Sequence, residues 1–189
     1  MQTSRALRIA TLAVAVLAFG CAPPIGVRHL SPPEANRAQT DNILSDDHLS
    51  VHSSGMLQRL GLRDRFDDDP VGVLRELHAG LGGFDEHERT LALSELSFAY
   101  AERSGDRTYY LAAAVYAWAF LMEEAQDADA TTDRYDERFR FAANLYNRAI
   151  ALGLASGDGN DLDLSSRSVH LFFGDLDLET APELSLIHI

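Results

Sequence analysis

Two histidines have the spacing closest to that of a metal site. His48 and His52 stand four residues apart, and Asp46 and Asp47 precede the first of them. On a helix this spacing would place both imidazoles on one face, where they could act as zinc ligands. The surrounding residues lack helical periodicity and no third ligand is placed near them, so we interpret the segment as a solvated loop. We therefore assign no metal-binding residue.

Covalent and cofactor chemistry has few candidate residues. All sixteen basic residues are Arg, which excludes a phosphate-binding P-loop, a Schiff-base Lys for pyridoxal phosphate and the serine enzymes built on S-x-x-K. The only cysteine is Cys21, which leaves no disulfide framework and no thiolate zinc site. No G-x-S-x-G occurs, and GLASG, from Gly153 to Gly157, has its Ser one place late. We assign no catalytic residue and no cofactor.

Two acidic clusters could hold calcium. GDGNDLDL, residues 157–164, resembles one copy of the nonapeptide calcium repeat. Its oxygen ligands would be Asp158, Asn160, Asp161 and Asp163. Such repeats bind calcium when stacked in rows, so we favour a linker for a single copy. The other cluster, Asp64, Asp67, Asp68 and Asp69, precedes a helix start, where the helix dipole favours negative charge, and capping explains it.

The N-terminus has the features of an export signal. Arg5 and Arg8 precede an uncharged, mostly apolar run from Ile9 to Phe19, which is too short to span a bilayer. Ala18, Phe19 and Gly20 lead into Cys21, and this end resembles the bacterial lipobox, in which a lipidated Cys becomes the first residue of the mature protein. The resemblance implies lipidation of Cys21, and Ala22 after it implies sorting to the outer membrane. The alternative is a plain secretory signal with an incidental cysteine.

Helix starts and stops can be read in the middle of the chain. Asp69 is predicted to cap a helix with Pro70 at its first position, and Gly82–Gly83 is predicted to end it. Asp85, with Glu88 three residues later, gives a capping-box-like start to the next helix. These signals predict consecutive helices joined by short loops.

A third predicted helix, Thr108–Glu124, is uncharged for fourteen residues and apolar on every side, so we expect it to be central. Its aromatic residues are interpreted as core rather than as the lining of a ligand groove: Tyr109, Tyr110, Tyr116, Trp118 and Phe120. A fourth helix, from about Arg134 to Ala155, shares with the third an A-x-x-x-Y-x-x-A pattern at 112–119 and 142–149. Small residues at this spacing let helices approach closely, and the pattern resembles tetratricopeptide repeats.

The predicted fold class is all-α, with tetratricopeptide-like helical hairpins and a short β segment at a truncated C-terminal end, where apolar residues alternate from Val169 to Leu178. The last six residues, LSLIHI, read as a translated sequencing adapter. The predicted organisation is a signal peptide (1–20), a lipidated tether (21–53) with one short helix from Glu34 to Leu44, a helical module (54–156), a linker and the start of a β-containing domain (157–183), and an artefact (184–189).

Two long segments carry a family resemblance. LALSELSFAYAERSGDRTYYLAAAVYAWAFL and DERFRFAANLYNRAIALGLA resemble the N-terminal helical region of large bacterial envelope lipoproteins whose later part is an α/β-hydrolase domain, over roughly residues 57–178. The resemblance implies a lipid-anchored scaffold for an esterase- or lipase-like domain downstream. The alternative is an independent helical-repeat adaptor that recruits an envelope protein. The formal net charge of −13 repels phosphates and excludes nucleic acid as a partner.

Overall fold

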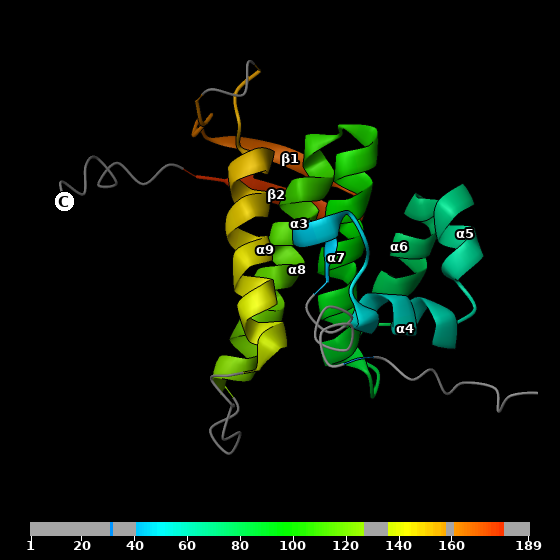
Figure 1. Ribbon diagram of the computed structural model, residues 1–189. Coiled ribbons are helices and arrows are strands. Elements are labelled where there is room, and N and C mark those ends of the chain that lie inside the picture. The colour runs from blue at the N-terminus through cyan, green and yellow to red at the C-terminus, as the bar shows by residue number, and fades with distance from the viewer. Residues whose placement is uncertain (1–30, 32–40, 127–135, 158–160, 180–189) are drawn as a thin grey trace, which may run out of the picture. The chain divides into compact units, whose positions relative to one another are not determined.

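The computed structural model describes residues 31, 41–126, 136–157 and 161–179. All the described helices and strands belong to one compact unit within residues 36–189. This part of the chain is mostly helical and carries a two-stranded antiparallel sheet at its C-terminal end, which confirms the predicted fold class at that level (Figure 1). The tetratricopeptide-like arrangement stays a prediction.

The elements follow one another through short connections. The helices are α3 (Ile43–Asp46), α4 (Val51–Arg59), α5 (Arg63–Asp68), α6 (Pro70–Ala79), α7 (Glu86–Ser104), α8 (Arg107–Gln126) and α9 (Glu137–Gly153), and the strands are β1 (Arg167–Leu171) and β2 (Gly174–Leu178). Among the residues that the structure describes, no helix is long and apolar enough to cross a membrane.

Helices α7, α8 and α9 form the centre of the fold, and α8 lies between the other two (Figure 1). Gly105 ends α7 with a left-handed φ of 72° and opens the two-residue link to α8, so these helices are antiparallel. Gly153, at the end of α9, approaches the start of α8 so closely that an added Cβ would lie 2.7 Å from Leu111 Cδ2. The prediction that α8 is central is confirmed for its position between α7 and α9, but α8 is not covered on every side, since Trp118 is 52% exposed.

Small side chains allow this close packing. Ala112 and Ala113 of α8 and Ala142 and Ala149 of α9 are fully buried. Ala142 and Ala149, the pattern alanines of α9, lie in one buried cluster with Ala113 of α8, as helices that interdigitate at short distance require. Ala112, the first pattern alanine of α8, is buried in a different cluster, which also holds Leu171 of the hairpin.

Helices α4, α5 and α6 pack on the side of α7 away from α9 (Figure 1). Their shared core consists of Met56, Leu57, Leu62, Phe66, Val73, Leu74 and Leu77, packed against Ala92, Leu93 and Leu96 of α7. The Asp69 cap on α6 is confirmed, since its carboxylate accepts from Gly72 N at 3.0 Å and Pro70 follows. The predicted stop at Gly82–Gly83 is wrong, because α6 ends at Ala79 with Gly80 as its cap.

Asp85 precedes α7 but does not form the predicted capping box, since its side chain makes no capping hydrogen bond. Its carboxylate instead accepts from Arg89 Nε at 3.1 Å and Nη2 at 3.0 Å. The guanidinium lowers the pKa of Asp85, although partial burial opposes this shift. The sequence signal therefore identified the start of α7 correctly. It predicted a capping hydrogen bond for Asp85, whereas the structure shows an ion pair with Arg89.

The β-hairpin lies on α8 with its apolar face inward. Val169 pairs with Leu176 and Leu171 with Gly174, which places alternate residues of both strands on one face. Leu171 is buried against Leu111 and Ala112 of α8. A two-stranded sheet is marginal by itself, so its order depends on this helix.

Several predictions concern residues outside the described ranges. These are the signal peptide, Cys21, most of the predicted helix from Glu34 to Leu44, the calcium-like ligands Asp158 and Asn160, and residues 184–189. Of the predicted 34–44 helix, the described part shows only that Asn42 caps α3. Ser50 and Ser53, which the prediction places in the tether, are buried against α7.

Candidate functional site

A buried carboxylate fastens the first described helices to the bundle. Glu95 of α7 is 0% exposed and accepts four hydrogen bonds. The donors are Ser50 N (2.8 Å), Ser50 Oγ (2.6 Å), Ile43 N (3.2 Å) and Ser53 Oγ. Four donors satisfy a carboxylate that would otherwise be costly to bury. We call this arrangement the Glu95 clasp.

Sequence reasoning missed the Glu95 clasp. The available signal was an acidic residue between Leu93 and Leu96, in a stretch whose helical period places it in the core. Its partners lie 42 to 52 residues earlier in the chain, so the sequence did not indicate which donors would meet it.

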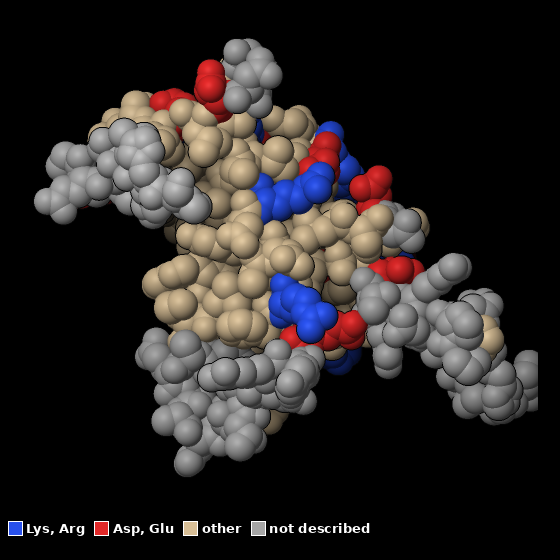
Figure 2. All heavy atoms as spheres, turned by 60° about the vertical axis from the view of Figure 1, so that its left-hand side comes forward, with Lys and Arg blue, Asp and Glu red and all other residues tan. Residues whose placement is uncertain are grey.

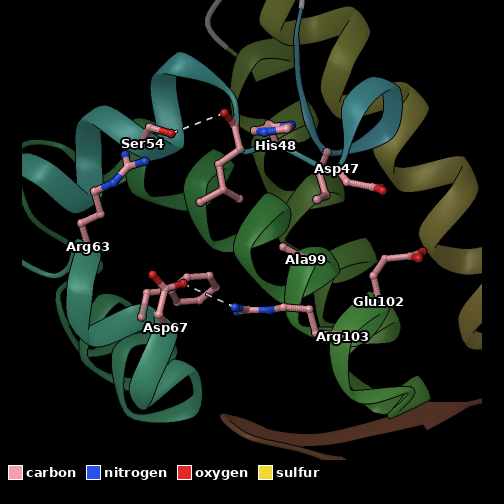
Figure 3. Close-up of a pocket in the computed structure, with 11 residues that line it drawn as sticks. Asp47, His48, Ser54, Arg63, Asp67, Ala99, Glu102 and Arg103 are labelled. Carbon is pink, nitrogen blue, oxygen red and sulfur yellow. Dashed lines mark hydrogen bonds and ion pairs between the residues drawn. The ribbon is translucent and has the colours of Figure 1, made fainter.

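Beside the clasp lies a polar pocket of about 530 Å³ between α3, α4, α5 and α7 (Figure 3). Its volume falls in the range of small-molecule sites. The lining residues are Ile43, Asp47, His48, Leu49, Ser54, Arg63, Phe66, Asp67, Ala99, Glu102 and Arg103. Figure 3 shows Asp67 facing Arg103 on one side, with Asp47 and Glu102 on the side opposite Arg63.

Several of the charged groups in the polar pocket already have partners. Arg103 lies 3.6 Å from Asp67 Oδ1 and stacks over the Phe66 ring at 4.8 Å. Glu102 accepts from the Tyr110 hydroxyl at 3.0 Å. Burial of the Tyr110 side chain, together with this smaller effect of the hydrogen bond, raises the pKa of Tyr110 to about 12. Acidic and basic groups both line the pocket, so its charge does not select an anion or a cation. It offers a volume and polar contacts.

The two candidate metal-ligating histidines are not brought together. His48 lies in the loop before α4 and lines the polar pocket, whereas His52 belongs to α4 and lines a small neighbouring pocket with Glu137 and Arg138. The loop interpretation is therefore wrong for His52, although its side chain is exposed. Within the described ranges, no three His, Cys, Asp or Glu side chains form a group that could hold a metal ion.

Three of the acidic residues singled out in the sequence have side-chain partners in the structure. Asp69 caps α6 and Asp67 pairs with Arg103. Asp163 accepts from Ser165 Oγ at 2.6 Å and lies 3.0 Å from Arg167, and these contacts lower its pKa. These three side chains therefore form a helix cap, an ion pair and a turn contact, respectively for Asp69, Asp67 and Asp163.

A second hollow, which we call the apolar groove, runs between α8, α9 and β2, with a volume of about 370 Å³. Its lining is mostly apolar, with the Tyr146 hydroxyl and the Trp118 indole N–H as polar side-chain groups. It consists of Leu111, Ala114, Val115, Trp118, Tyr146, Ile150, Leu154, Leu176 and Leu178. Uncharged residues make up much of the face that Figure 2 turns forward. Trp118, the only tryptophan in the sequence, lines this groove and is 52% exposed.

The aromatic stripe of α8 divides between the core and this groove. Tyr116 and Phe120 are buried, and the Tyr116 hydroxyl lies 2.8 Å from His78 Nδ1. Burial raises the pKa of Tyr116 well above its usual value. The prediction of a core position is wrong for Trp118, because its side chain is half exposed and lines the apolar groove.

No family model, curated protein or solved structure matches the chain. The apolar groove and the polar pocket are therefore interpreted from their own geometry. Of the two, the groove has the more selective lining, since it offers an apolar surface and a half-exposed aromatic side chain of the kind that is enriched at protein interfaces.

Proposed function

We propose that this chain is a lipid-anchored helical scaffold of the cell envelope, fixed to the outer membrane through Cys21, that holds a domain downstream in the same polypeptide. By the family resemblance, that domain is an esterase- or lipase-like α/β-hydrolase. The described part contributes support rather than chemistry.

The apolar groove is the observation that carries the proposal. Its surface, with Trp118 half exposed, is the kind that proteins cover with another polypeptide segment. Leu176 and Leu178 of β2 form one wall, so the polypeptide that leaves β2 starts at the groove. The paired helices α7–α8 and α8–α9 support a tetratricopeptide-like scaffold beneath it.

A photo-crosslinking experiment tests which partner covers the groove. A benzophenone amino acid replaces Trp118 in the protein expressed from the gene read beyond Glu183. The matched control places the same group at Val51 on α4, which is 59% exposed and outside the groove. We expect an intramolecular crosslink between position 118 and the downstream domain. An adduct with a separate envelope protein would contradict the scaffold proposal and support the adaptor.

Fatty-acid labelling tests the anchor independently. We expect radioactive palmitate to label the wild-type protein and to leave the Cys21→Ser variant unlabelled and released from the membrane fraction. Equal labelling or equal membrane association of both proteins would contradict lipid anchoring at Cys21. The described helices alone, purified, should show no ester hydrolysis.

A further inference from the structure

We propose that the outer edge of β2 and the apolar groove together form a docking site for an added β-strand whose side chains alternate between apolar and basic. This inference rests on the proposed function, because the strand is assigned to the downstream domain of the same polypeptide. It specifies how that domain attaches and which residues it presents.

The first observation is an open sheet edge. Within the described part of the chain, β2 pairs only with β1, in an antiparallel register from Gly174 to Leu178. Its other edge presents backbone N–H and C=O groups to which a further strand can bond. Addition of a strand to such an edge is a common mode of peptide recognition.

The second observation is the apolar floor beside that edge. Leu176 and Leu178 face the helices, and the groove continues past them over Trp118, Tyr146 and Ile150. No residue of β1 lines the groove, so it lies on the side of β2 away from β1. A strand added to β2 would therefore extend the sheet over this floor, and every second side chain would point into it.

The third observation is the charge on the opposite face. Asp175 and Asp177 alternate with the two leucines and are exposed. Asp175 Oδ1 lies 2.7 Å from His170 Nδ1 of β1, and no described residue pairs with the side chain of Asp177. Opposite charges on neighbouring strands stabilise a sheet, whereas like charges directly across destabilise it. The added strand should therefore carry Lys or Arg on its outward face.

The same charges argue against a second copy of this chain as the occupant. Pairing β2 with β2 of another molecule would place the carboxylates of Asp175 and Asp177 against each other across the new edge. A basic strand would form hydrogen bonds with the open backbone edge of β2 and would place positive charges beside Asp175 and Asp177.

Trp118 provides the measurement, because it is the only tryptophan and lines the groove. The purified chain is titrated with a synthetic peptide of alternating Val and Lys while the Trp118 emission is recorded. The control peptides are a scrambled sequence of the same composition and an alternating Val and Glu sequence. We expect saturable binding and a blue shift of emission with the alternating basic peptide alone.

A charge-reversal variant tests the assigned contacts. Asp175→Arg combined with Asp177→Arg changes two exposed side chains, so the fold should remain. Two cross-strand charge pairs correspond to a change of roughly 3- to 10-fold in affinity. We expect the variant to bind the basic peptide more weakly by that factor and to gain binding of the acidic peptide.

Two outcomes would overturn the inference. Equal binding of the alternating and scrambled basic peptides would show attraction to a negative protein rather than strand addition. Absence of a Trp118 shift with every peptide would show that the groove takes no strand. Neither result depends on the crosslink at position 118, so a failure here leaves the scaffold proposal standing. An intermolecular crosslink at that position would overturn the assignment of the strand to the same polypeptide, while peptide binding would still establish that the groove takes an alternating basic strand.

Discussion

At the residue scale, Glu95 shows how one side chain can join segments that are distant in sequence. Asp69 was predictable as a cap because its partner Gly72 lies three residues away and Pro70 follows it. The role of Glu95 was not predictable, because its donors are Ser50, Ser53 and Ile43, at the other end of the described helices. Local capping signals can be read from sequence, whereas a buried network between distant segments depends on the tertiary fold.

Removing the Glu95 carboxylate should loosen α3 and α4. Glu95→Ala leaves buried donors unpaired, and we expect a loss of about 3 kcal/mol in the free energy of unfolding. Glu95→Gln, which keeps one acceptor, should lose less, about 1–2 kcal/mol. Urea unfolding measures the loss, and limited trypsin digestion should show faster cleavage at Arg59 of α4.

Glu88→Gln on the exposed side of α7 is the matched control and should change neither measurement. An unchanged midpoint and an unchanged tryptic pattern for Glu95→Ala would contradict the role assigned to the clasp.

At the element scale, the hairpin is held by its tip as well as by its inner face. Phe172 and Phe173 form the two-residue turn between β1 and β2. Phe173 stacks on His78 of α6 at 5.2 Å between ring centroids and lies 4.9 Å from Tyr116 of α8, while Phe172 stacks on Tyr109 at 5.8 Å. The tip of the hairpin thus contacts α6 as well as α8.

Phe173→Ala should release the hairpin while leaving α7, α8 and α9 folded. The ring is partly exposed, so we expect a cost of about 2 kcal/mol, less than for a fully buried phenylalanine. Hydrogen exchange should show faster exchange of the amides from 167 to 178, with the helical amides of α8 unchanged.

The control for this change is Ser168→Ala, since Ser168 is exposed on the outer face of β1. It should alter exchange little. Equal protection of the hairpin in Phe173→Ala and wild type would mean that the inner face alone holds the strands.

At the scale of the whole molecule, α7 and α9 run parallel on either side of α8 and each begins beside an Asp–Arg pair. Asp85 pairs with Arg89, and Asp136 pairs with Arg138 at 2.7 Å. The guanidinium groups lower the pKa of both aspartates below the usual 3.8, against the effect of partial burial. A lowered folded-state pKa stabilises the fold at pH above the unfolded value, and this contribution is lost as pH falls through the folded value.

Replacing one of these aspartates should therefore flatten the acid side of the stability profile. Asp136→Asn should lose about 0.5 kcal/mol at pH 6, where the pair is partly screened by solvent, and almost nothing at pH 2. Urea unfolding at both pH values measures the difference. Asp177→Asn on the exposed face of β2 is the control, and an equal loss for Asp136→Asn at both pH values would contradict the assignment.

The long helices and the two strands were predictable from sequence, whereas the short helices and the surroundings of each element were not. Uncharged residues through α8 identified it as the central helix, and alternation identified both strands. The short helices α4 and α5 were missed, because six to nine residues carry too little periodicity to distinguish them from loops. The exposure of Trp118 was missed because an apolar helix does not reveal which side its neighbours leave open.

The Glu95 clasp has a mechanical consequence. The chain that precedes Asp41 joins the described fold at Ile43, whose backbone N–H is one of the donors to Glu95. Tension transmitted along that chain would load these short polar bonds before it reached the apolar interior of the bundle. Hydrogen bonds weaken steeply once their distance and angle depart from ideal values, so we expect this junction to separate abruptly under load.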